Sequence, residues 1–306
     1  MNGGTAAAPS AAVVVTLSHR STYTPDEETA FRHIRYYLGR HHVYVLIPES
    51  HDASYPGFRE KRFPDRFFGS ARAHGALLLS KRFYRAFEQY EYILIHHLDA
   101  LAFGDQLAEW CAADYDYIGA PWLVSPDTPH IDREKVGNGG FSLRRVSSFL
   151  RVLSSRRYFV TPEEYWASYA ARTTPLLRTI NFPRKYLKRV RALNDVHWHI
   201  RWARRGDVHE DRFWAEYATH YDPSFRIAPV EVAMRFAFEA EPRRCYERIG
   251  EVLPFGAHRW STFDRPFYEP FLLRSGDGSL VQRSEHPVAR RRPRVADFTM
   301  EERTAS

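Results

Sequence analysis

The first half of the chain alternates short apolar runs with amphipathic stretches. Four runs have the pattern of buried parallel strands, namely Val13–Ser18, Val43–Pro48, Tyr92–His96 and Tyr115–Ile118. Helices are predicted over Thr24–Leu38, Leu77–Gln89 and Gly104–Ala112, and a loop rich in Pro, Gly and aromatic residues is predicted over residues 49–68. This alternation predicts an α/β fold in which helices flank a mostly parallel central sheet.

The second half of the chain is less regular. We expect helices over Thr161–Ala171 and Lys185–Arg205, and a strand over Phe225–Val230. From about Ser275 the sequence becomes polar and loses its periodicity, which is typical of a disordered segment. We therefore expect a flexible N-terminal tail over residues 1–12, a single domain over residues 13–274, and a disordered basic tail over residues 275–306.

The composition excludes two classes of protein. Aromatic residues make up 15% and hydrophobic residues 44% of the 306 positions, which is too much apolar mass for a disordered chain. No stretch approaches the roughly 18 consecutive apolar residues of a membrane helix. Two cysteines cannot build a disulfide framework, and the N-terminal residues lack the basic region of a signal peptide. We expect a cytoplasmic protein.

Polar residues follow three of the expected strands. Ligands of such sheets bind at the carboxyl ends of the strands, so Ser18–Arg20, Glu49–His51 and His97–Asp99 are expected along one rim. Positions two apart in an extended chain share a face, so His97 and Asp99 can point at one site. Asp99 either binds a divalent cation that carries a diphosphate or caps the following turn.

A glycine-rich segment, Gly137-Asn138-Gly139-Gly140, precedes Phe141-Ser142. Three glycines in four positions allow the backbone to approach a ligand closely. The segment has neither the Lys-Ser/Thr end of a Walker loop nor the spacing of a dinucleotide-binding fingerprint. The alternative is a tight turn before a strand.

Two further features could carry chemistry. Glu210 and Asp211 adjoin each other ahead of aromatic residues, and one of these carboxylates could act as a general base over an acceptor. Acids are also favoured at a helix start by the macrodipole, whatever else they do. His258 lies in a loop between Gly256 and Trp260, and is either a metal ligand or a packed polar ring.

The order of these features resembles that of the nucleotide-sugar transferases of GT-A fold. The arrangement is most similar to that of the inverting galactosyltransferase and fringe-like group. Four stretches resemble a bacterial family of uncharacterised glycosyltransferase-like proteins, and the resemblance covers roughly residues 13–265. These stretches are YILIHHLDALAF, DYDYIGAPW, VGNGGFSLRRV and LPFGAHRW.

The resemblance assigns roles to individual residues. Asp99 matches the final acid of the metal-binding Asp-x-Asp motif, and His97 stands in place of its first acid. His258 matches a late histidine that completes the metal site in some members. The implied cofactor is a divalent cation, Mn²⁺ or Mg²⁺, and imidazole can itself ligate Mn²⁺-type ions. The acidic pair supplies the catalytic base, for which we favour Asp211 over Glu210.

The resemblance also implies how the chain is divided. Residues 13–122 would form the nucleotide-sugar-binding half and residues 123–274 the acceptor and catalytic half. The residues expected to contact donor or acceptor are Ser18, His19, Arg20, Trp122, Asn138, Gly139 and Gly140.

The implied function is transfer of a sugar from a nucleoside-diphosphate sugar to the hydroxyl of a glycan, glycolipid or other acceptor, as in bacterial polysaccharide biosynthesis. Inversion by direct displacement is expected. The first alternative is an inactive nucleotide-sugar-binding or scaffold protein of the same fold, favoured by the missing acid at His97. The second is a nucleic-acid-binding protein, suggested by charge and aromatic content together, although no nucleic acid is expected as partner.

The net charge of +7 is concentrated in one segment. Between Arg172 and Gly206 there are ten cations and one acid, Asp195. A preference for Arg over Lys follows from codon usage, but the clustering does not. The segment is either a solvated helical face or a site for an anionic acceptor or an anionic membrane surface, which would place the protein peripherally at the inner face of a membrane.

Overall fold

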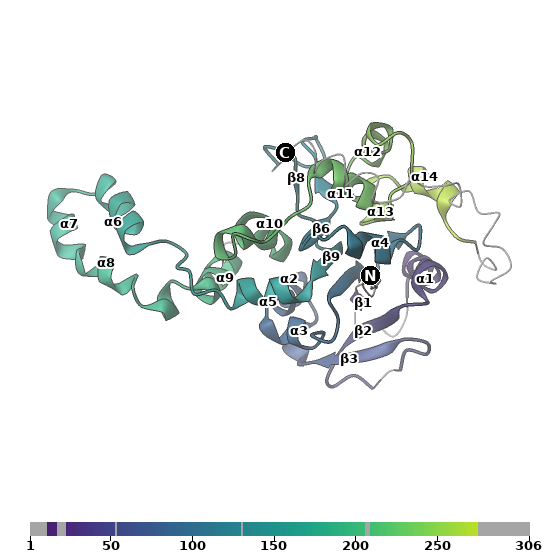
Figure 1. Cartoon of the computed structure of the whole chain (residues 1–306), viewed down its shortest axis with the longest axis horizontal. Coiled ribbons are helices and arrows are strands. Elements are labelled where there is room, and N and C mark those ends of the chain that lie inside the picture. Colours follow the sequence, from purple (N-terminus) through teal and green to yellow (C-terminus); the bar gives the residue numbers. More distant parts are fainter. Residues whose placement is uncertain (1–10, 17–22, 53, 130, 206–208, 275–306) are drawn as a thin grey trace, which may run out of the picture.

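The computed structural model describes residues 11–16, 23–52, 54–129, 131–205 and 209–274. Its centre is a six-stranded sheet in the order β3-β2-β1-β4-β9-β6 (Figure 1). Neighbouring strands from β3 to β4 are parallel, whereas β9 is antiparallel to both β4 and β6. The strands are β1 Ala11–Thr16, β2 His42–Pro48, β3 Arg59–Phe63, β4 Tyr92–His97, β6 Tyr117–Gly119 and β9 Phe141–Arg145.

Helices cover both faces of this sheet, as its buried apolar strands require. In β1, Val13 and Val15 pack into one core, whereas Val14 packs into the other, because successive side chains of a strand point to opposite faces. The first core is covered by α1 Pro25–His33, the π-helix η1 Ile34–Leu38, α4 Leu107–Ala112 and α11 Val230–Phe236. The second is covered by α2 Ala71–Leu78, α3 Lys81–Arg85, α5 Val146–Leu153, α9 Val196–Arg205 and α10 Glu210–Tyr221. The mixed α/β architecture predicted from the sequence is confirmed.

A smaller sheet fixes the C-terminal part of the described chain against this body. Its order is β10-β11-β5, and a third core lies around it. The remaining elements are β5 Leu101–Ala102, β7 Pro121–Trp122, β8 Lys135–Val136, β10 Ala237–Phe238, β11 Gly256–Ala257, η2 Asp65–Phe67, α12 Pro242–Arg248, α13 Trp260–Phe263, α14 Arg265–Tyr268 and η4 Glu269–Phe271.

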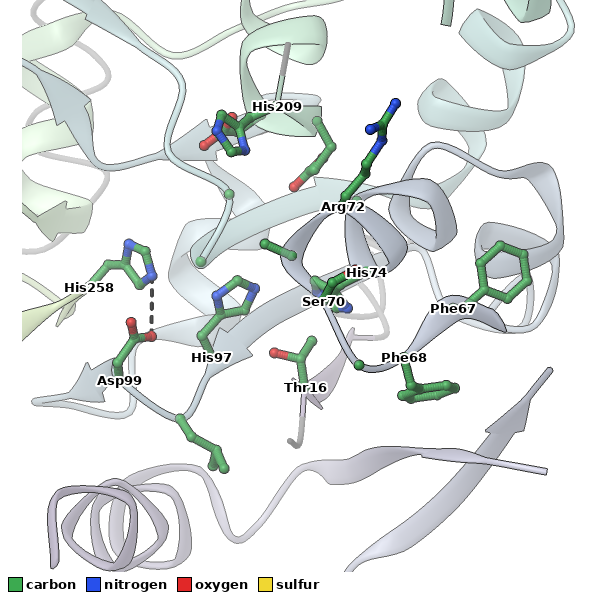
Figure 2. A pocket seen from close by; sticks show the side chains of 18 of the residues that line it. Thr16, Phe67, Phe68, Ser70, Arg72, His74, His97, Asp99, His209 and His258 are labelled. Carbon is green, nitrogen blue, oxygen red and sulfur yellow. Dashed lines mark ion pairs between the residues drawn. The ribbon is translucent and has the colours of Figure 1, made fainter. Parts of the chain in front are cut away.

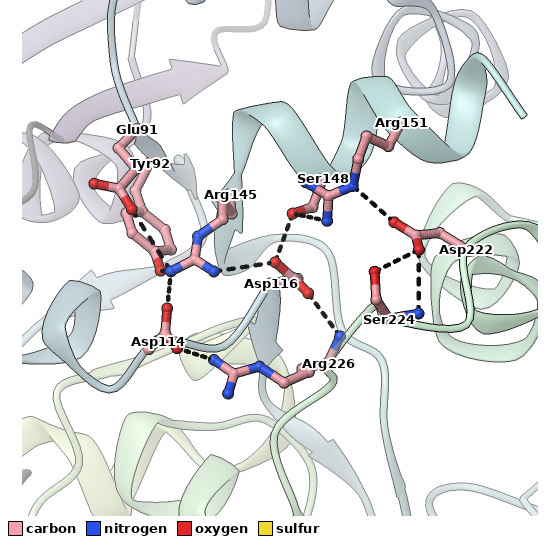
Figure 3. A network of polar contacts seen from close by, with 10 residues as sticks. All are labelled: Glu91, Tyr92, Asp114, Asp116, Arg145, Ser148, Arg151, Asp222, Ser224 and Arg226. Carbon is pink, nitrogen blue, oxygen red and sulfur yellow. Dashed lines mark hydrogen bonds and ion pairs between the residues drawn. The ribbon is translucent and has the colours of Figure 1, made fainter.

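A network of charged groups ties β6, β9 and α5 together (Figure 3). The guanidinium of Arg145 pairs with Asp114 and Asp116. Asp116 is buried and also accepts hydrogen bonds from Ser148, at 2.5 Å, and from the backbone N–H of Arg226, at 2.7 Å. Asp114 has a positive φ of 64°. The buried carboxylate of Asp116 is stabilised because hydrogen bonds satisfy its lone pairs.

Several expectations about elements are wrong. Residues 59–63 form the edge strand β3 rather than loop, and Ala11 and Ala12 belong to β1 rather than to a tail. The expected strand Phe225–Val230 is absent: Ile227 makes only an isolated bridge to Tyr117, and α11 begins at Val230. The two expected tails, apart from residues 11–12, lie outside the described residues.

The expected helix Lys185–Arg205 is broken and belongs partly to an arm that extends from the body (Figure 1). We call residues 162–193 the arm. It contains α6 Pro162–Ala171, α7 Pro175–Asn181, α8 Pro183–Leu187 and η3 Arg191–Leu193. Asn194 is fully buried and closes the base of the arm, because its side chain bonds the backbone of Val160 in both directions. No helix in the described part of the chain is both long enough and apolar enough to cross a membrane.

Candidate functional site

A cavity of about 1050 Å³ opens at the carboxyl ends of β1 and β4 (Figure 2). Ligands of open α/β sheets bind at this edge. Thr16, the last residue of β1, and His97, Leu98 and Asp99 at the end of β4 line it. Residues of α2, the start of α10, Gly139, Gly140 and His258 supply further walls.

Three side chains with metal-ligating atoms meet in this cavity. One ligand atom from each of His97, Asp99 and His258 lies within 4.8 Å of the others. Nε2 of His258 lies 3.2 Å from Oδ1 of Asp99, and Nε2 of His97 is buried without a hydrogen-bond partner. Figure 2 shows the three side chains side by side. The arrangement offers two imidazole nitrogens and a carboxylate, a donor set that suits Mn²⁺-type ions better than Mg²⁺, which prefers oxygen.

His258 is held from behind by a second carboxylate. Its Nδ1 lies 2.9 Å from Oε1 of Glu239, a buried residue that follows β10. A carboxylate on the far nitrogen of a histidine fixes the ring and leaves the other nitrogen facing the site, as in many metal centres. Glu239 therefore orients His258, and no local pattern in the sequence indicates this role.

The imidazoles of the cluster differ in charge. Burial lowers the pKa of His97 well below its usual value, and the positive charge of His258 lowers it further. Burial also acts to lower the pKa of His258, but its hydrogen bonds to Asp99 and Glu239 outweigh burial and raise it to about 10. His97 is therefore neutral at pH 7, and His258 is protonated. A cation that binds here has to displace the proton of His258.

The backbone of the glycine segment contacts the side chains of His258 and Glu210 directly. A Cβ atom on Gly140 would collide with the imidazole of His258, and one on Gly139 would collide with Oε1 of Glu210. Asn138 makes the turn, because its Oδ1 accepts a 3.0 Å hydrogen bond from the N–H of Gly140. The carbonyl of Gly140 in turn accepts a 2.8 Å bond from the N–H of His97. Glycine is required at both positions because the backbone contacts side chains directly.

The two adjacent acids at the start of α10 have different environments. Glu210 forms an ion pair with the fully buried guanidinium of Arg144, with 2.8 Å between Oε1 and Nη2. Asp211 has no cationic partner among the described residues, and its Oδ1 accepts only a 2.7 Å bond from the N–H of Arg212. Burial raises the pKa of Asp211 to about 7, and the nearby charge of Glu210 adds to the increase. Asp211 is thus the carboxylate that can take up a proton near neutral pH.

The structure brings together seven residues that the sequence indicated. The residues that line the same cavity are His97, Asp99, Gly139, Gly140, Glu210, Asp211 and His258. Asn138 and Trp122 do not line it. Asn138 is buried in the turn, and the indole of Trp122 packs against Gly137 under the ammonium of Lys135. Their expected contacts with sugars are therefore not supported by the geometry. Ser18, His19 and Arg20 lie outside the described residues, and Glu49–His51 do not line the cavity.

Sequence reasoning missed three residues of the site. Arg144 and Glu239 act from behind Glu210 and His258. His74, on α2, has a partnerless Nε2 and its ring centroid lies 5.3 Å from that of His97. Burial lowers the pKa of His74 to about 4, so its ring is neutral. A histidine in the middle of an amphipathic helix has no distinguishing signal in the sequence.

Fold and cavity together define an α/β protein with a cluster of two histidines and an acid opposite an acidic pair. The chain belongs to the family described as "Protein of unknown function (DUF5672)", whose profile matches residues 57–258. A comparison with curated proteins finds no match. Among solved structures, the chain is similar to the apo form of the glycosyltransferase GlyE from Streptococcus pneumoniae TIGR4, with a TM-score of 0.41 and 13% sequence identity. The similarity covers 87% of this chain, which spans 61% of that one.

Proposed function

We propose that this protein is a glycosyltransferase that moves a sugar from a nucleoside-diphosphate sugar to an acceptor hydroxyl. The sequence motifs that resemble nucleotide-sugar transferases support the class. The observation that carries the proposal is the pairing of Glu210 with Arg144, which leaves Asp211 unpaired on the wall of the same cavity as His97, Asp99 and His258.

In this reaction Asp211 removes the proton of the acceptor hydroxyl while the oxygen of that hydroxyl attacks the anomeric carbon of the donor sugar. The bond from that carbon to the diphosphate oxygen breaks, and the nucleoside diphosphate leaves with the electron pair. A single displacement inverts the anomeric centre. A base is most effective when its pKa lies near the working pH, which fits a carboxyl with a pKa of about 7.

His97, Asp99 and His258 would hold the divalent cation. Bound there, it would neutralise the charge that develops on the leaving diphosphate. Two observations fit such an ion: the ligand atoms converge within 4.8 Å, and the buried Nε2 of His97 lacks a hydrogen-bond partner. Glu239 fixes the ring of His258 for this role.

The test is a screen of nucleotide sugars by thermal shift with Mn²⁺ present, followed by a transfer or donor-hydrolysis assay with each donor that binds. A ligand at 100 times its Kd, bound only by the folded protein, adds about 2.7 kcal/mol to the free energy of unfolding. We expect Asp211→Asn to keep donor binding and to lose transfer by at least a hundredfold, since general base catalysis contributes about that much. Near wild-type turnover in this variant would disprove the assignment of the base.

A second candidate is an inactive nucleotide-sugar-binding protein. It is favoured by His97, which stands where a first metal-binding acid is expected. Titration calorimetry with nucleoside diphosphates, with and without Mn²⁺, distinguishes the two. Binding without any hydrolysis or transfer of the matching sugar would support the binding protein.

A further inference from the structure

The arm (residues 162–193) is a helical segment without a core of its own. Pro162 is its one buried residue; none of residues 163–193 is buried. Isolated helices of this length are marginal in water, and in proteins they are stabilised by packing an apolar face on a partner. Aromatic contacts within the arm, such as that between Trp166 and Phe182 with ring centroids 5.2 Å apart, hold α6 against the junction of α7 and α8 but leave the outer surface of the arm free.

That outer surface is apolar. Of the ten large hydrophobic side chains that are exposed in the described structure, eight lie between residues 176 and 193. Leu176 is 71% and Ile180 is 62% exposed, although Leu and Ile are among the residues most often buried. The other six are Leu177, Phe182, Tyr186, Leu187, Val190 and Leu193. An exposed apolar patch of this extent marks an interaction surface.

The same stretch of the chain is strongly cationic. Between Arg172 and Leu193 there are seven cationic side chains and no acidic one. Of these seven cations, only Lys185 and Arg189 form an ion pair within the described part of the chain. Both pair with Glu163, at 3.8 and 3.9 Å. Arg184 and Arg191 are exposed. The partner of the arm is therefore anionic as well as apolar.

We propose that the arm docks on the surface of a membrane that contains anionic phospholipid. The exposed aliphatic side chains would enter the boundary between headgroups and acyl chains, and the cations would lie among the phosphates, as in interfacial amphipathic helices. A second copy of the chain fits the charges poorly, because two such arms would bring like charges together. The proposal does not depend on the proposed sugar transfer.

The attachment of the arm relates this surface to the cavity. Asn194 fixes the base of the arm to Val160, and α9 begins two residues later. Arg204, near the end of α9, lines the cavity, and its Nη2 donates a 3.4 Å hydrogen bond to the carbonyl of Arg72, which also lines it. The helix α9 thus runs from the base of the arm to the cavity, and docking of the arm would bring the cavity close to the bilayer.

The test is cosedimentation of the full chain with vesicles of phosphatidylcholine alone and with phosphatidylglycerol added. We expect binding only to the anionic vesicles and a decrease with salt. Arg184→Gln/Arg191→Gln should weaken partitioning roughly 30-fold, at about fivefold per cation. The matched control is Arg59→Gln/Arg85→Gln, which removes two exposed cations of the body and should have little effect.

A second pair tests the apolar contact. Leu176→Ser/Ile180→Ser should reduce partitioning by roughly tenfold per side chain, whereas Val124→Ser, at an exposed site outside the arm, should not. None of these side chains is buried, so circular dichroism should show unchanged folding. Absence of binding at low salt, or equal loss in the control variants, would overturn the proposal. So would a dimer without lipid that Leu176→Ser/Ile180→Ser dissociates, since it would make a second copy the partner.

Discussion

Two neighbouring carboxyl groups in one cavity have different environments because of their partners. The guanidinium of Arg144 neutralises Glu210, and this pair lies against the glycine segment. Asp211 is largely removed from solvent and lies near Glu210 and Glu239, and these effects raise its pKa more than the N–H of Arg212 and the charge of His209 lower it. Environments that move the pKa values of two acids apart are how active sites divide acid and base roles.

The rate of transfer should depend on the ionisation of Asp211. Its pKa of about 7 means that the base is protonated below neutral pH. We expect kcat/KM to fall about tenfold per pH unit below 7 and to level off above it. A pH profile with saturating metal and limiting donor measures this, and a profile flat down to pH 5 would contradict the role of Asp211.

The same burial should lower stability at high pH. A carboxyl whose folded pKa lies above its ordinary value of 3.8 binds its proton more tightly in the folded protein, so the free energy of unfolding falls as pH rises between 3.8 and 7. Asp211→Asn removes this charge. Urea titrations should show the variant more stable than the wild type by about 2–4 kcal/mol at pH 8.5, with a smaller difference at pH 5.5.

Gly140 should tolerate no side chain. In Gly140→Ala the Cβ atom collides with the imidazole of His258, so the ring or the turn has to move. We expect a loss of about 1–3 kcal/mol in the free energy of unfolding and a loss of Mn²⁺ binding. Gly75→Ala is the matched control on the same cavity wall: its Cβ would lie 3.6 Å from Cβ of Glu210, an ordinary contact, and alanine favours α2. An equal effect of both changes would contradict the close contact.

At the scale of elements, one buried ion pair joins β9 to α10. Arg144 is fully buried. Its guanidinium also donates hydrogen bonds to the hydroxyl oxygens of Tyr84 and Ser142, both at 3.0 Å. The pair therefore sets the position of α10, and with it the position of Asp211 over the cavity.

Replacing one partner of this ion pair should lower the free energy of unfolding more than replacing both. Arg144→Met leaves the carboxylate of Glu210 buried without a counterion, and we expect a loss of about 3–5 kcal/mol in the free energy of unfolding. Arg144→Met/Glu210→Met should recover much of it, because no lone charge remains buried. Chemical denaturation of the four proteins in this cycle gives the coupling energy, and an additive result would contradict the ion pair.

The elements with a strong local pattern could be predicted from the sequence. The buried runs of β1, β2 and β4 and the Thr24 cap of α1 are examples. The edge strand β3 was missed because its sequence REKRF is charged, as is common where an edge faces solvent. Residues 225–229 have the local sequence pattern of a strand. Their hydrogen bonds to Asp116 and Tyr117 form only an isolated bridge and not a ladder.

The site was predictable only where a motif is local. Asp99, the glycine segment and the acidic pair each have a pattern within a few residues. Glu239 and Arg144 act through contacts across 19 and 66 positions of the chain, which tertiary packing alone determines. The charge of the arm could be read from the sequence, but the exposure of its hydrophobic side chains could not.

At the scale of the whole molecule, the arm and the body should be separable. Because Val160 and Asn194 are hydrogen-bonded neighbours, a short Gly-Ser linker can replace residues 161–193. We expect this deletion to leave the melting temperature within a few degrees of the wild type, since only Pro162 of the arm is buried, and to abolish binding to anionic vesicles. A protein that fails to fold without the arm would show that the arm belongs to the core.

The small sheet β10-β11-β5 also has a consequence in time. His258 follows β11 directly, and its N–H bonds the carbonyl of Phe238 at 2.8 Å, so it reaches Asp99 only once β11 has docked beside β5. During translation His97 and Asp99 emerge from the ribosome long before Gly256 is added to the chain. Contacts between positions so far apart in the sequence form slowly. During synthesis the cluster of His97, Asp99 and His258 is therefore incomplete, and it closes only when the large body has already been built.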